Sequence, residues 1–262
     1  STRLGCPTQE DPKSDGGISV TLAERPGCLD AVKAAYGDLL PYFTTTQTAR
    51  DLGALVQAAS GAAAKRSVMG QSYGTTLVQR WLHFFPDRAS SVILDSLANP
   101  GTTFDDFTEQ SDRVGHDYLD LCAADPACSG KLGPDPGKTA DEAFAAAFET
   151  GACPALTQAG LDRAGLARAL YTMLTFVEYR AMIPPVLHRL ARCNAEDVAA
   201  LTFLKAQLTP GATADLAETL FGEVLYHHIV LSEMCDGSLG SPAEHLAALQ
   251  SVEFGLISVD LD

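Results

Sequence analysis

A serine between two glycines is the residue of this chain whose setting best fits covalent chemistry. Ser72 is the centre of the pentapeptide Gly70-Gln71-Ser72-Tyr73-Gly74. A sharp turn from a strand into a helix needs small residues two places before and two places after the serine, because the backbone is crowded there. Such a turn exposes the serine Oγ and directs the N–H of Tyr73 toward the place where an oxyanion would form. The pattern predicts a nucleophilic Ser72; the alternative is an ordinary serine in a glycine-bounded turn.

The segments around the pentapeptide must position this serine, and they alternate between helix and strand. Apolar residues share one face of a helix over about 46–59, and a short strand is predicted at about 65–69. A second helix runs from the pentapeptide to Phe85, where Pro86 ends it, and a buried strand follows at about 91–95. This order favours a parallel α/β sheet. Two strands do not complete such a sheet, so we expect the remaining strands elsewhere in a longer polypeptide. The alternative is a self-sufficient helical protein that kept the turn.

Several segments near the serine resemble one family of enzymes. They are Tyr42-Phe43-Thr44-Thr45, Ala49-Arg50-Asp51-Leu52, Gly70-Gln71-Ser72-Tyr73-Gly74-Thr75-Thr76-Leu77, Phe85-Pro86-Asp87-Arg88 and Val92-Ile93-Leu94-Asp95-Ser96. Over about residues 40–100 the chain resembles the central block of secreted α/β-hydrolase peptidases of the tripeptidyl aminopeptidase and proline iminopeptidase type. The resemblance implies an α/β-hydrolase core segment in which Ser72 attacks the substrate and the Tyr73 N–H binds the oxyanion.

The chain also departs from that family. The resemblance places a glycine-rich oxyanion loop before residue 1, and the catalytic acid and histidine after residue 262. No Gly-x-x-Asp-x-x-Thr-Pro segment and no terminal Gly-His pair is found in the sequence, so neither role is carried onto a residue. The stretch 229–236 resembles the end of the family's lid, where Cys235 would have a disulfide partner further downstream.

The sequence after Pro100 changes to a succession of helices. They are predicted at about 104–122, 139–149, 160–180, 184–193, 195–208, 212–235 and 242–250, with Pro and Gly segments such as 133–137 and 209–211 between them. An insertion at this point of an α/β-hydrolase is a helical lid above the nucleophile. We therefore expect three parts: a core segment at 1–100, a lid at 101–250 and the start of a return to the core at 251–262.

Composition excludes some classes of partner. The 262 residues carry a formal charge of −15, which argues against nucleic acid, because neutralising phosphates needs clustered Lys and Arg. Apolar runs stay short of the roughly 20 residues that cross a bilayer, so no membrane partner is expected.

Seven cysteines without metal-type spacing favour an oxidising compartment, and hence a secreted, periplasmic or cell-surface protein. Cys122 and Cys128 flank a turn-forming insert that suits a small disulfide loop. Further candidate pairs, which spacing alone does not fix, are Cys6 with Cys28 and Cys153 with Cys193. Cys235 then remains alone, and a buried free thiol is the alternative to a downstream partner.

No histidine stands out as the catalytic base. The six candidates are His83, His116, His188, His227, His228 and His245. His227 and His228 make a poor metal pair, because neighbours on a helix point about 100° apart, and adding Glu223 still leaves too few ligands. Asp95 ends a strand where some α/β-hydrolases place the acid, but accepting hydrogen bonds from loop N–H groups is its simpler role.

These residues favour a serine hydrolase that needs no metal and no organic cofactor. The resemblance implies an exported aminopeptidase that releases short peptides or proline-type residues from free amino termini, through an acyl-enzyme at Ser72. A lid carboxylate would bind the substrate ammonium, and the candidates are Glu178, Glu233 and Asp236. The alternatives are a carboxylesterase acting on small acyl esters, and a hydrolase-like binding module without a complete triad.

Overall fold

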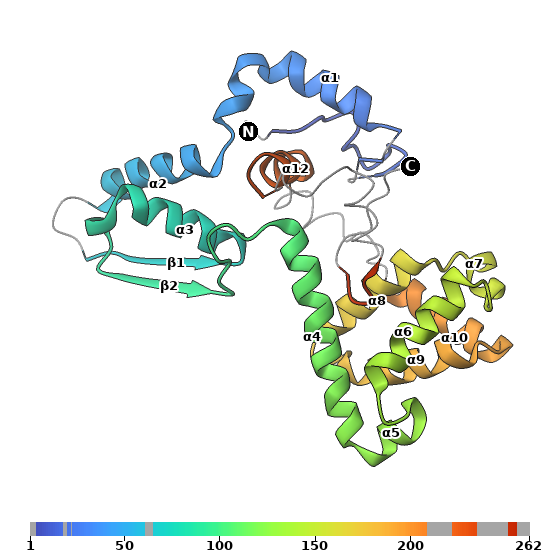
Figure 1. Cartoon of the computed structure of the whole chain (residues 1–262). Helices are drawn as coiled ribbons and strands as arrows, with labels where there is room; N and C mark the ends of the chain where they lie inside the picture. The colour runs from blue at the N-terminus through green and yellow to red at the C-terminus, as the bar shows by residue number, and fades with distance from the viewer. Residues whose placement is uncertain are drawn as a thin grey trace. The chain divides into compact units, whose positions relative to one another are not determined.

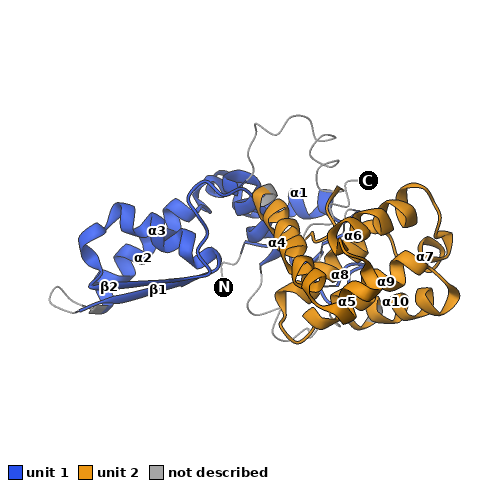
Figure 2. Cartoon of the chain, turned by 60° about the horizontal axis from the view of Figure 1, so that its bottom comes forward, with its two compact units in different colours: residues 1–103, 212–235 blue, residues 104–211, 236–262 orange. Residues whose placement is uncertain are grey.

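The computed structural model describes residues 4–17, 20–21, 23–60, 65–208, 222–234 and 251–255. The chain divides into two compact units, one of residues 1–103 with 212–235 and one of residues 104–211 with 236–262 (Figure 2). The change at residue 103 lies near the change in pattern predicted at 100. The division differs from the predicted one later in the chain. Residues 222–234, which we expected in the helical part, belong to the first unit, and residues 251–255 belong to the second.

The first unit contains a small parallel sheet. Strand β1 (Ser67–Gln71) pairs with strand β2 (Ser91–Asp95), from Ser67 opposite Ser91 to Gln71 opposite Asp95. Helix α3 (Tyr73–Phe84) and a short 3-10 turn (Pro86–Arg88) connect the strands, which makes a βαβ unit. Helix α2 (Thr45–Ser60) and α3 lie on the same face of the sheet (Figure 1).

Helices α2 and α3 approach each other closely. A Cβ at Gly53 of α2 would lie 2.5 Å or less from two atoms of the Phe85 ring, so only glycine fits there. Ala49, Val78 and Trp81 are buried where the two helices meet. Helix α2 begins with a capping contact, because the Gln47 N–H donates to Thr44 Oγ1 at 3.1 Å.

The opposite face of the sheet is open in the part of the chain that the structure describes. Met69 and Ile93 face each other across the two strands, and their exposed fractions are 61% and 56%. Parallel sheets are normally covered on both faces. The exposed apolar face of these two described strands is therefore unusual for a parallel sheet.

The rest of the first unit surrounds a disulfide. Helix α1 (Arg25–Tyr36) leads into a 3-10 turn (Gly37–Tyr42), and the Cys6–Cys28 disulfide joins α1 to the preceding loop. A small core forms there from Leu4, Cys6, Val20, Cys28 and Val32. Helix α12 (Glu223–Ile229), followed by a π-helical turn (Val230–Met234), belongs to the same unit, and the Val20 N–H donates to Glu223 Oε2 at 3.1 Å.

The second unit is helical in its described residues. Its elements are α4 (Phe104–Ala124), α5 (Pro126–Leu132), α6 (Pro136–Phe144), a π-helical turn (Ala145–Glu149), α7 (Pro154–Gln158), α8 (Arg163–Thr175), a 3-10 turn (Arg180–Met182), α9 (Ile183–Arg192) and α10 (Ala195–Leu208). One core runs through them, with Phe144, Leu170, Leu187 and Phe254 fully buried. Disulfides join Cys122 to Cys128 and Cys153 to Cys193, so all three bridges are pairs that the sequence favoured.

Local chemistry explains where these helices differ from the predicted ones. Segment 133–137 was expected only as a break, yet Asp135 accepts the Lys138 N–H and Pro136 opens α6. Helix α8 ends at Thr175 instead of continuing to 180. The short helices α5 and α7 were not predicted; each begins with a proline at its first position.

The expected helix at 242–250 lies outside the described residues. Within them, no helix has the length and apolar character to cross a membrane.

Candidate active site

Ser72 occupies the single residue between β1 and α3, in a conformation that L-residues rarely adopt. Its backbone angles are φ 53° and ψ −127°, and its side chain is exposed. Non-glycine residues in such regions cost about 1–3 kcal/mol and persist where the surroundings hold them. This is the local geometry that the pentapeptide predicted: a strand, a strained serine and a helix.

Hydrogen bonds from both sides hold the strained turn. The Ser72 N–H donates to the Asp95 carbonyl at the end of β2, at 3.1 Å. The Ser72 carbonyl accepts from Thr75, through its N–H at 2.9 Å and its Oγ1 at 2.7 Å. Thr75 is fully buried, and its Oγ1 also accepts the Ala98 N–H at 3.0 Å. Thr75 therefore links the turn to the chain beyond β2, a role that the sequence analysis missed.

The two glycines of the pentapeptide differ in their surroundings. A Cβ at Gly70 would lie 2.4 Å from the Gly74 carbonyl oxygen and 2.9 Å from the Thr75 nitrogen, so the turn excludes any side chain there. A Cβ at Gly74 would meet nothing within 4 Å among the described residues. The crowding that we expected at both glycines is found only at Gly70, because it is the Gly74 backbone that approaches Gly70.

Tyr73 contributes a backbone donor and a phenol. Its N–H is in the first turn of α3, where N–H groups have no intrahelical acceptor, and no acceptor is found for it in the described residues. The N–H is thus free to bind an oxyanion beside Ser72. The phenol shares a hydrogen bond of 2.6 Å with the hydroxyl of buried Thr45.

Glu233 reaches the same place from the π-helical turn that follows α12. Its Oε1 accepts the Thr45 N–H at 2.7 Å, at the start of α2. Burial raises the pKa of Tyr73 above its ordinary value; the hydrogen bond with Thr45 opposes this, and the negative charge of Glu233 adds to it. Of the three carboxylates proposed for substrate binding, Glu233 is therefore the one that the structure brings close to Tyr73, next to Ser72. Glu178 is exposed in the other unit, and Asp236 lies outside the described residues.

The catalytic base and acid do not emerge from the described contacts. In these residues no histidine makes a hydrogen bond to Ser72. His83 is exposed on α3, His227 and His228 are half-buried on α12, His188 contacts the Lys131 carbonyl, and His245 lies outside the described residues. The Asp95 carboxylate accepts from the Gln71 amide at 3.1 Å and from the Ser96 hydroxyl at 3.3 Å, while its carbonyl holds Ser72. Asp95 therefore supports the turn.

One group of described residues has the ligand types of a metal site, and it lies in the helical unit. Atoms of Asp112, His116 and Glu253 that could bind an ion all lie within 4.8 Å of one another. The sequence analysis did not find this group, because Glu253 is distant along the chain from the other two.

Two curated proteins share part of this sequence. The chain is 42% identical over 64 residues to a tripeptidyl aminopeptidase of Streptomyces lividans, and it has the same identity over the same length to one of Streptomyces coelicolor. The shared stretch covers 24% of this chain and only 12% of each relative, so the match spans a small part of those proteins. No protein-family model and no solved structure matches the chain.

Proposed function

We propose that this chain carries the nucleophile of a serine peptidase with an α/β-hydrolase core. The observation that carries the proposal is the strained, exposed Ser72 between a parallel strand and a helix. The partial similarity to tripeptidyl aminopeptidases supports a peptidase-type activity. A small sheet with one uncovered face is consistent with a segment of a larger α/β core, and the helical unit would be its lid.

The proposed reaction begins with attack of Ser72 Oγ on the scissile carbonyl. A histidine outside the described contacts takes the hydroxyl proton and later gives it to the leaving amine. The Tyr73 N–H stabilises the tetrahedral oxyanion, and water then hydrolyses the acyl-enzyme. The chain's own contribution is the exposed oxygen, the aligned donor and the hydrogen bonds that fix the turn.

The substrate class that fits best is a peptide with a free amino terminus. Glu233 places a carboxylate beside Tyr73 and its Oε1 accepts the Thr45 N–H, while no donor to its Oε2 is found among the described residues. The second oxygen and the negative charge are available to an ammonium group. Three disulfides support export to an oxidising compartment, where such peptides would be met.

A fluorophosphonate label on the full-length gene product tests the nucleophile. We expect labelling of Ser72 and its loss in Ser72→Ala, together with a fall in kcat of roughly 10⁴–10⁶. Ser96→Ala is the matched control, because Ser96 is also exposed and has a positive φ of 58° after β2. No labelling of the native protein would identify a binding module instead, and labelling that persists in Ser72→Ala would place the nucleophile at another residue. Turnover of esters without turnover of peptides would identify a carboxylesterase.

A further inference from the structure

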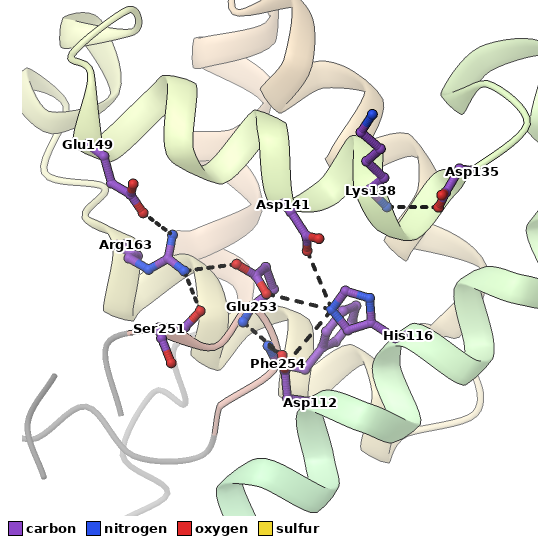
Figure 3. A network of polar contacts seen from close by, with 10 residues as sticks. All are labelled: Asp112, His116, Asp135, Lys138, Asp141, Glu149, Arg163, Ser251, Glu253 and Phe254. Atoms are coloured by element: carbon purple, nitrogen blue, oxygen red, sulfur yellow. Dashed lines mark hydrogen bonds and ion pairs between the residues drawn. The ribbon is translucent and has the colours of Figure 1, made fainter. Parts of the chain in front are cut away.

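Three separate segments of the helical unit converge on one histidine nitrogen. Asp112 and His116 lie one turn apart on α4, Asp141 lies on α6, and Glu253 lies in the segment 251–255 (Figure 3). The His116 Nε2 is 3.9 Å from Asp112 Oδ2, 3.6 Å from Asp141 Oδ1 and 3.6 Å from Glu253 Oε2.

Other contacts fix the orientation of two of these carboxylates. Asp112 Oδ1 accepts the N–H groups of Glu253 and Phe254, at 2.8 and 3.0 Å. Glu253 Oε1 accepts from Arg163 Nη2 at 2.8 Å. The remaining oxygen of each carboxylate therefore faces His116. Outer contacts that orient inner ligands in this way are typical of metal sites.

The distances from His116 Nε2 to the three carboxylate oxygens are too long for hydrogen bonds. They are close to the distances between neighbouring ligand atoms around a metal ion. All three distances exceed the usual 2.7–3.2 Å. With bonds of about 2.0–2.2 Å, ligand atoms around tetrahedral zinc lie roughly 3.4 Å apart. The Glu253 side chain is only 8% exposed, yet its Oε2 lies 3.6 Å from the imidazole nitrogen. A buried carboxylate oxygen at that distance leaves room for a bridging ion.

The charge around His116 also favours a cation. The carboxylates of Asp112, Asp141 and Glu253 surround one imidazole. Arg163 contacts Glu253, but its Nη1 also lies 3.7 Å from Glu149 Oε1, so its positive charge is divided between two carboxylates. The site therefore attracts positive charge, which a proton or a metal ion can supply.

We propose that Asp112, His116 and Glu253 bind a divalent cation of the zinc type, and that the nearby carboxylate of Asp141 adds negative charge beside it. An imidazole with carboxylates suits zinc better than calcium or magnesium, which prefer oxygen ligands alone. The ion would join the segment 251–255 to α4, and its role would be structural. This site does not depend on the proposed function of Ser72.

Titration of Zn²⁺ into metal-stripped full-length protein tests the proposal. We expect one site at neutral pH, binding that weakens about tenfold or more in His116→Gln and in Glu253→Gln, and a raised Tm of the native protein with Zn²⁺. His188→Gln is the matched control, since His188 is a half-buried histidine of the same unit that contacts only a carbonyl among the groups described. It should leave the affinity unchanged.

A measurement on the native protein covers the case in which these variants fail to fold. Co²⁺ bound at the site should give the visible absorption of a low-coordinate nitrogen and oxygen site, and Zn²⁺ should displace it. Acidification should release the ion, because protons compete with a metal ion for the lone pairs of imidazole and carboxylate ligands. Absence of Zn²⁺ binding, equal binding by His116→Gln, or a preference for Ca²⁺ or Mg²⁺ would overturn the proposal and leave a proton-bridged network of ion pairs.

Discussion

The glycines on either side of Ser72 are equivalent in sequence but not in structure. A side chain at Gly70 would collide with the backbone of Gly74 and Thr75, whereas one at Gly74 would not. We therefore expect Gly70→Ala to lower the free energy of unfolding by roughly 1–3 kcal/mol and to reduce labelling of Ser72. Gly74→Ala, the matched variant, should be neutral or stabilising by up to about 1 kcal/mol. Urea unfolding measures both. Equal effects would show that the turn is not built as described.

The charge of Glu233 can be separated from its structural role. Glu233→Gln keeps an oxygen that accepts the Thr45 N–H, so α2 should retain this contact while the charge is lost. In the full-length protein we expect KM for a tripeptidyl anilide with a free amino terminus to rise roughly 10- to 100-fold, with a smaller change in kcat. KM for the N-acetylated anilide should not change.

Glu178→Gln is the control, because that exposed carboxylate lies in the other unit. A rise in KM that is the same for both anilides, or no rise at all, would remove Glu233 from the substrate site.

At the scale of elements, helix α10 shows a capping contact that responds to pH. The Asp197 N–H donates to Asn194 Oδ1 at 2.9 Å, and Asp197 Oδ1 accepts from Arg189 and Arg192 at 3.0 and 2.5 Å. Burial alone would raise the pKa of Asp197, but the hydrogen bonds from Arg192 and the Asn194 N–H hold it below its ordinary value. A carboxyl with a lowered pKa in the folded state stabilises the protein above its unfolded pKa of about 3.9, and this contribution is lost as the pH falls.

We therefore expect Asp197→Asn to destabilise the protein at pH 7 by about 1 kcal/mol, because both guanidinium groups are partly exposed and screened. The difference from the native protein should shrink below about pH 4. Chemical unfolding monitored by circular dichroism at several pH values measures it. Asp120→Asn, on exposed α4 surface, controls for the loss of one negative charge. A difference that stays constant down to pH 2 would contradict the role of the ionised carboxylate.

The elements show which parts of the site a sequence reveals. Gly70, Ser72 and Tyr73 form a local pattern whose spacing specifies a strand-to-helix turn, and the structure places β1 and α3 on either side of it. Thr75 and Thr45 act through contacts with Ala98, Tyr73 and Glu233, which are distant in sequence, so periodicity carried no signal for them. The sequence analysis missed the group of Asp112, His116 and Glu253 for the same reason, because Glu253 is distant in sequence from the other two.

At the scale of the whole molecule, the two units differ in how their apolar residues are covered. The helical unit has one continuous core, whereas Met69 and Ile93 leave the sheet of the first unit open on one face in the described structure. Exposed apolar surface on a parallel sheet is unusual, because such sheets are normally covered on both sides. The two units should therefore differ in how strongly they bind a hydrophobic probe.

This difference predicts where a hydrophobic dye will bind to the 262-residue chain. We expect ANS fluorescence that falls by about half or more in Ile93→Lys, because the charge would occupy the centre of the open face. Leu121→Lys is the matched control: Leu121 is 67% exposed on α4, more than Ile93, but it belongs to the unit with the continuous core. Its substitution should leave the fluorescence nearly unchanged. If Ile93→Lys has no effect, or if Leu121→Lys has the larger one, the open face of the sheet is covered in solution, and the inference that β1 and β2 belong to a larger sheet loses its main physical support.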